Sequence, residues 1–177
     1  IPLRDSEITL AEVLRENGYQ TAAIGKMHIT TQFMPKEDEQ DDWPRDRYGF
    51  DIIHTTCDCK TGEYLKWLRE VSPGDYEEVK LQGERKARED RASAADKDLS
   101  GPPQVYPSKI DPLCHQSHWI ADRMIDLIRE SEPDRPFFAY CSFVDPHHPF
   151  DPPEPYASMY DPDTLAKPVG MEGELLD

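Results

Sequence analysis

The chain has 177 residues and a formal net charge of −16, with 36 Asp and Glu residues against 20 Lys and Arg. That length is enough for one domain with a hydrophobic core. The acidity argues against nucleic acid or an anionic membrane as a partner, since both require a basic surface. No apolar run reaches the roughly 20 residues that span a membrane. The sequence begins without an initiator Met, so we interpret residues 1–177 as an internal segment.

Local signals predict a helix and then a strand near the start of the chain. Thr9 and Glu12 have the spacing of a capping box, which marks a helix start. Asn17-Gly18 is typical of a helix end, because glycine is suited to the left-handed conformation found there. Residues 19–24 follow this helix end, and we predict that they form a short strand.

The middle of the chain gives one helix and a long polar stretch. A helix is predicted for residues 61–70, with Ser72-Pro73-Gly74 ending it. Residues 75–110 are rich in charged residues and proline without apolar periodicity. We predict that they form a long, mobile, polar insertion, with room for a brief helix.

The strongest periodic signals lie in the second half. Apolar residues recur at helical spacing from residue 116 to residue 130, and Glu132-Pro133 breaks the pattern. The apolar run at residues 137–144 is typical of a central strand that is covered on both faces. Helix, strand, helix and strand in this order predict an α/β fold with a parallel sheet.

Polar side chains follow both predicted strands. Lys26 and His28 come after the first strand, and Asp145, His147 and His148 come after the second. Ligands of parallel sheets bind beyond the carboxyl ends of the strands, so we expect these side chains to form one site. An ammonium can neutralise the charge of a sulfate or phosphate ester. A histidine can protonate the departing oxygen or take a proton from a nucleophile.

Other polar residues have simpler interpretations. We interpret Asp145 as a turn or capping residue and His54 as structural or exposed. His115 and His118 flank a helix start, which favours capping or surface roles. Cysteines at positions 57, 59, 114 and 141 are interpreted as ordinary thiols. A zinc site built from the first three with a nearby histidine is the alternative, although C-x-C is tighter than the usual zinc spacing.

Three stretches are similar to segments of the sulfatases, which belong to the alkaline-phosphatase superfamily. They are Gly18-Tyr19-x-Thr21-x-x-Ile24-Gly25-Lys26-Met27-His28, Arg47-Tyr48-Gly49-Phe50-Asp51, and the helix–strand–histidine block from Trp119 to Phe150. The resemblance implies an incomplete alkaline-phosphatase-like fold, with a mainly parallel sheet sandwiched by helices. It also implies that residues 1–177 are part of a sulfatase catalytic domain that carries the polar insertion at 75–110.

The resemblance implies roles for the residues of the expected site. Lys26 matches a lysine that contacts the sulfate and the nucleophile, and His28 matches a histidine that hydrogen-bonds the nucleophile. His147 begins an H-x-P element whose histidine contacts the sulfate and assists the leaving group. His148 is the middle residue of that element and ranks below His147. Catalysis is thus expected from His28 and His147, and substrate binding from Lys26, His28, His147 and His148.

The chain departs from the family pattern at the nucleophile and the metal. Sulfatases use calcium and a formylglycine made from the cysteine or serine of a C/S-x-P-S/A-R motif, and none of the four cysteines here has that context. Residues 131–135 match the motif loosely, but they precede the second strand and should lie at the opposite edge of the sheet. No calcium ligands are assigned, so we expect no turnover from the chain alone.

We therefore interpret the chain as a segment of a sulfuric ester hydrolase that binds the sulfate group of its substrate. One alternative is a phosphonate or phosphate monoester hydrolase of the same superfamily, and another is a non-catalytic anion- or carbohydrate-binding relative. The substrate is left open, with a sulfated carbohydrate as one candidate. The insertion at 75–110 is a candidate specificity element. Location in the periplasm or secretion is implied only by the resemblance.

Overall fold

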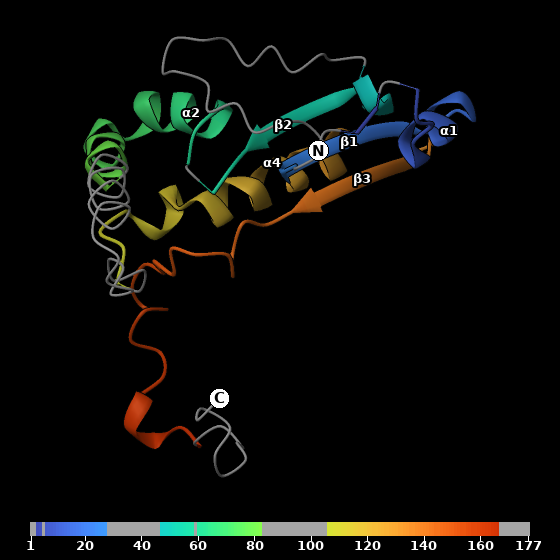
Figure 1. Ribbon diagram of the computed structural model, residues 1–177. Helices are drawn as coiled ribbons and strands as arrows, with labels where there is room; N and C mark the ends of the chain where they lie inside the picture. Colours follow the sequence, from blue (N-terminus) through green and yellow to red (C-terminus); the bar gives the residue numbers. More distant parts are fainter. Residues whose placement is uncertain (1–2, 5, 28–46, 59, 83–105, 167–177) are drawn as a thin grey trace.

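The computed structural model describes residues 3–4, 6–27, 47–58, 60–82 and 106–166. Within them lies a three-stranded sheet with the strand order β2-β1-β3 (Figure 1). Its strands are β1 (Gln20–Lys26), β2 (Ile52–Thr56) and β3 (Phe137–Ser142). Both strand pairs are parallel. The predicted α/β class with a parallel sheet is therefore confirmed.

Helices flank the sheet, and the longer ones begin and end close to the predicted residues. The helices are α1 (Leu10–Glu16), α2 (Glu63–Val71) and α4 (Gln116–Glu130), with short 3₁₀ helices η1 (Arg47–Gly49), η2 (Pro112–Cys114) and η3 (Pro162–Thr164). The capping box predicted for α1 is present: Thr9 Oγ1 accepts from the Glu12 backbone N–H at 3.1 Å, and the Glu12 carboxylate accepts from the Thr9 N–H at 2.7 Å. Residues 73–82 are also helical.

The side chains of β1 alternate between two cores. Ala22 and Ile24 pack with α2 and α4 in the larger cluster, whereas Ala23 packs with α1 and η1 in the smaller one. In the larger cluster the Tyr64 and Trp119 rings meet edge to face, with centroids 5.9 Å apart. Hydrophobic side chains therefore pack against both faces of the sheet at β1, its central strand.

Strand β2 was not predicted, and β3 is less covered than expected. No element is predicted from the sequence between Asp51 and Cys57, whereas residues 52–56 pair with β1. Strand β3 pairs with β1 on one side and is an edge strand within the described residues, so the prediction of a central strand covered on both faces is wrong there. Phe137 is 37% exposed and Tyr140 is 46% exposed. Tyr140 pairs with Ala23 and so lies on the face of α1, which has only seven residues and covers one end of that face.

The ends of the range 75–110 belong to the folded unit. Val79 and Ile110 are buried in the larger core. Tyr106 and Ser108 donate backbone hydrogen bonds to the carbonyls of Phe150 and Pro152, at 3.1 and 2.9 Å. Residues 83–105 lie outside the described part of the chain, so the insertion stays a prediction.

Candidate functional site

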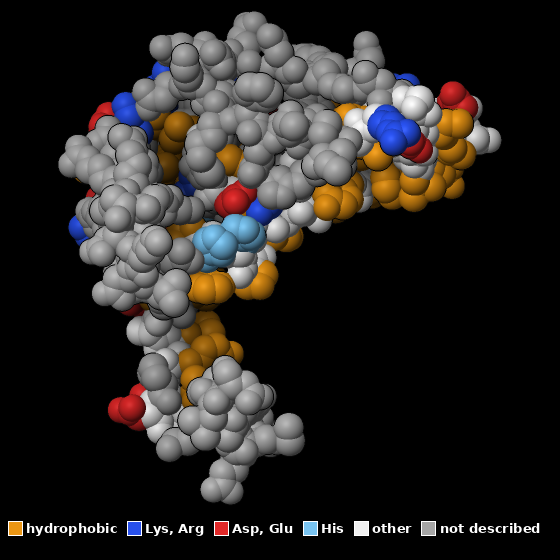
Figure 2. All heavy atoms as spheres, in the orientation of Figure 1, with side chains coloured by type: hydrophobic (Ala, Val, Ile, Leu, Met, Phe, Trp, Pro, Cys, Tyr) orange, Lys and Arg blue, Asp and Glu red, His pale blue; other side chains and the backbone are white. Residues whose placement is uncertain are grey.

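Side chains from three distant segments meet at the carboxyl edge of the sheet. Lys26 is the last residue of β1, and its Nζ lies 3.1 Å from Oδ1 of Asp58, in the turn that follows β2. His147, in the segment after β3, places Nε2 3.7 Å from Oδ2 of the same carboxylate. Figure 2 shows histidine, acidic and basic side chains side by side on this face. The expectation that the polar residues after β1 and β3 share one edge is therefore confirmed for Lys26 and His147.

The backbone conformation of Gly25 places Lys26 at this position at the end of β1. It pairs in register with Ser142 of β3 and has a φ of +95°, a conformation that favours glycine. A Cβ at this position would lie 1.9 Å from the Ser142 carbonyl oxygen, so any side chain would force the two strands apart. The glycine before the lysine is therefore required by the backbone geometry at the end of β1.

The turn that carries Asp58 is fixed to the start of α4. The Gln116 side-chain amide, which is buried, donates to Thr56 Oγ1 and to the Cys57 carbonyl, the latter at 2.8 Å. The Lys60 backbone N–H donates to the same Cys57 carbonyl at 2.9 Å. These hydrogen bonds therefore hold the turn that contains Asp58 in position.

The Asp58 carboxylate is 15% exposed and is held in its charged form. Burial alone would raise its pKa, but its own backbone N–H, the Lys26 ammonium and His147 together outweigh that effect and lower the pKa below the usual value. The carboxyl is therefore ionised at neutral pH. Asp58 is thus a permanent negative charge between the two groups expected to bind an anion.

The proton positions on His147 follow from its hydrogen bond. Its Nδ1 lies 2.6 Å from the carbonyl oxygen of His148, and a carbonyl can only accept, so Nδ1 carries the proton. The other ring nitrogen, Nε2, faces Asp58 and forms an ion pair with it when it also carries a proton. The His148 ring is exposed and stacks on the His147 ring at a centroid distance of 4.2 Å. His148 thus orients His147 through its carbonyl and its ring.

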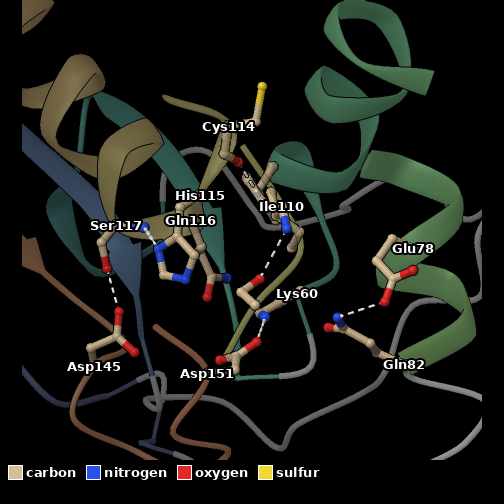
Figure 3. Close-up of polar contacts among 12 residues, drawn as sticks. Lys60, Glu78, Gln82, Ile110, Cys114, His115, Gln116, Ser117, Asp145 and Asp151 are labelled. Carbon is tan, nitrogen blue, oxygen red and sulfur yellow. Dashed lines mark hydrogen bonds and ion pairs between the residues drawn. The ribbon is translucent and has the colours of Figure 1, made fainter. Parts of the chain in front are cut away.

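A second group of polar side chains joins the turn after β2, the start of α4 and the segment after β3 (Figure 3). The buried side chains of Lys60 and Asp151 form an ion pair that joins the turn after β2 to the segment after β3. Ser117 at the start of α4 donates to the Asp145 carboxylate, which gives Asp145 the structural role that was expected. Asp145 thereby ties the end of β3 to α4.

His115 has the predicted capping role, and it is buried. Its Nδ1 accepts from the Ser117 backbone N–H at 3.3 Å, at the N-cap of α4, and the residue is 6% exposed. Burial and the nearby Lys60 lower its pKa, and Asp145 and Asp151 only partly offset this. His118 has the predicted surface position, where its Nε2 lies 3.5 Å from Asp122.

Two further expectations have different outcomes. His28 lies outside the described residues, so its place in the site stays a prediction. Residues 131–135 lie at the opposite edge of the sheet, as predicted, because Arg135 donates to the carbonyls of Gly18 and Tyr19 just before β1, at 3.2 and 3.1 Å. They are therefore remote from Lys26.

The described residues do not fit a calcium site. They contain no group of three or more His, Cys, Asp or Glu side chains that could hold a metal ion. Asp58, the acidic residue that lies next to Lys26 and His147, forms ion pairs with both. Calcium and formylglycine are thus implied for this chain by resemblance alone. No helix of the described residues combines the length and apolarity needed to cross a membrane.

Comparisons with known proteins place the chain in a family. The sulfatase family model matches residues 1–167. An arylsulfatase of Clostridium perfringens is 28% identical over 171 residues, covering 92% of this chain and 32% of that protein. An ulvan-active sulfatase of Formosa agariphila is 25% identical over 168 residues, covering 92% and 25%. The chain thus spans a third or less of the length of these relatives.

A solved structure has the same fold. The phosphonate monoester hydrolase of Agrobacterium radiobacter superposes with a TM-score of 0.58 at 22% identity, covering 94% of this chain and 31% of that one. At that identity the likeness concerns the fold, which is an incomplete version of the same α/β domain here. With most of its length matched by the family model, the chain belongs to the sulfatase family.

Proposed function

We propose that this chain supplies the oxyanion-binding side of a site that hydrolyses sulfuric esters. The observation that carries the proposal is the convergence of Lys26 and His147 on one carboxylate, at 3.1 and 3.7 Å. Lys26 and His147 already face the carboxylate of Asp58. The same two side chains are therefore suited to bind the sulfate group of a substrate. His28 is proposed as a further member of the site on the basis of the sequence resemblance.

The chemistry of the two groups is complementary. The Lys26 ammonium would act as a fixed cation that binds the sulfate oxygens and stabilises charge that develops on them. His147 has its Nδ1–H engaged by a carbonyl, so Nε2 is the atom that can carry a proton to the departing oxygen. We assign His147 this catalytic role, and Lys26 and His148 roles in binding and orientation.

Two alternatives share this geometry. A phosphonate or phosphate monoester presents the same tetrahedral oxyanion, and the chain shares its fold with a phosphonate monoester hydrolase. A non-catalytic anion-binding relative would also retain the pocket. Among sulfate esters we propose a sulfated carbohydrate, since one relative is named for activity on ulvan.

The first test measures anion binding by the chain. Methyl sulfate is titrated into the chain, and binding is monitored by NMR. We expect Lys26→Ala to weaken the affinity by about tenfold or more, because it removes the cation of the pocket. Lys109→Ala is the matched control, since that lysine is 76% exposed. Equal affinities of Lys26→Ala and the unmodified chain would contradict the proposal.

The second test is turnover by the protein as its cells make it. We expect hydrolysis of 4-nitrophenyl sulfate, and a faster rate with 4-nitrophenyl phenylphosphonate would favour the phosphonate alternative. Binding of methyl sulfate with no turnover of either ester would favour the non-catalytic relative.

A further inference from the structure

Asp58 is an unexpected member of the site that is proposed to bind an anion. It lies between Lys26 and His147, the two groups proposed to bind the substrate's oxyanion. An anion that enters this position must approach a carboxylate as well as a cation. The repulsion grows with the charge of the anion, because Coulomb energy is proportional to the product of the charges.

The position of this carboxylate is built into the fold. Gln116 holds the turn through Thr56 and the Cys57 carbonyl, and the side chain of Asp58 is 15% exposed. The buried Lys60–Asp151 pair fixes the other end of the turn to the segment that carries His147. Burial raises the pKa of Asp58, but its backbone hydrogen bond and the contacts of Lys26 and His147 lower it by more. Asp58 therefore retains its negative charge at neutral pH.

We propose that Asp58 is a specificity-determining residue that makes the pocket select monoanionic tetrahedral esters and reject dianionic ones. This inference rests on the proposed function and narrows its substrate class. Sulfate monoesters and phosphonate monoesters carry one negative charge. Phosphate monoesters carry nearly two at neutral pH, because their second pKa is about 6. Asp58 thus favours the first two classes and disfavours phosphate monoesters.

The test uses two probes of the same shape and different charge. Methyl sulfate is a monoanion, and methyl phosphate is close to a dianion at about pH 8. The unmodified chain should bind methyl sulfate more tightly. Asp58→Asn, which keeps the shape and removes the charge, should raise the affinity for methyl phosphate by about tenfold and that for methyl sulfate by clearly less. Dissociation constants are measured by NMR titration.

Three controls isolate the charge of Asp58. Asp134→Asn removes one exposed carboxylate at the opposite edge of the sheet and should leave the preference unchanged. Asp58→Glu keeps the charge and should keep the preference, which a purely structural role would not explain. At about pH 5 methyl phosphate is a monoanion, so the unmodified chain should then bind both probes similarly. Lys26 and His147 face Asp58 at both pH values, and methyl sulfate reports any change in them.

The outcomes separate this inference from the function on which it rests. One outcome is that Lys26→Ala no longer binds methyl sulfate, while Asp58→Asn changes the affinities for both probes equally or weakens both. In that case the specificity role of Asp58 is wrong, and the proposal that Lys26 binds the anion is retained. If the unmodified chain binds neither probe, or binds both regardless of Lys26, the proposed function is wrong and the inference falls with it.

Discussion

At the scale of single residues, the sequence pointed to two of the three groups that meet in the pocket. Lys26 and His147 could be predicted because each comes shortly after a segment that was predicted to be a strand. Asp58 could not, because the strand before it was not predicted, and nothing then placed its turn at the same edge. The Lys60–Asp151 pair joins residues 91 positions apart, so no local pattern reveals it.

The Lys60–Asp151 pair should matter for stability because both side chains are buried. Asp151→Asn would leave the Lys60 ammonium buried without its counterion, and we expect a loss of about 3–5 kcal/mol in the free energy of unfolding. Urea denaturation measures this loss. The half-exposed pair Arg123–Asp126, with nitrogen and oxygen 3.1 Å apart, is the matched control. Asp126→Asn should cost less than about 1 kcal/mol.

A double variant separates the buried charge from the shape of the segment. Lys60→Met combined with Asp151→Leu removes both charges and should recover most of the stability lost in Asp151→Asn, because an apolar pair can replace a buried ion pair. A double variant as unstable as Asp151→Asn would show that the unpaired ammonium is not the cause.

At the scale of elements, prediction succeeded where the pattern was long. Helix α4 runs from Gln116 to Glu130, the predicted range, because fifteen residues give a clear apolar periodicity. Strand β2 has only five residues and contains a histidine, His54, that pairs with Glu63 at 2.8 Å. Its four β-branched residues were the sequence signal that favours a strand. A run this short is also compatible with irregular structure, so it did not by itself predict a strand.

The junction of β1 and β3 gives a prediction about two glycines. Gly25 and Gly18 both have positive φ, +95° and +88°, but a Cβ on Gly25 would clash with Ser142 whereas one on Gly18 would meet nothing within 4 Å. Gly18→Ala should cost only the left-handed strain, about 1–2 kcal/mol. Gly25→Ala should cost about 1–3 kcal/mol more, because strands must separate. Urea denaturation of both variants checks the difference, and equal losses would contradict it.

At the scale of the whole molecule, the acidic composition and the site coexist because the site carries its own charge balance. The chain has a formal net charge of −16, and one of its carboxylates, that of Asp58, lies 3.1 Å from the Lys26 ammonium. The overall charge was readable from composition. How Lys26, Asp58 and His147 are brought together depends on the register of three strands and on the turns after them, which only the folded chain determines.

The stability of the whole fold should also depend on pH through His115. Its pKa lies below the usual 6.5 because it is buried and near Lys60, so the unfolded chain binds the proton first as the pH falls. The free energy of unfolding should therefore decrease from about pH 7.5 to about pH 5.5, a window in which Asp58 stays ionised. His115→Asn should reduce this decrease while retaining a side chain that can cap α4. His148→Asn, which changes an exposed ring, should leave it unchanged, and urea denaturation at the two pH values measures all three chains. A pH dependence that is the same in His115→Asn as in the unmodified chain would assign the effect to other groups.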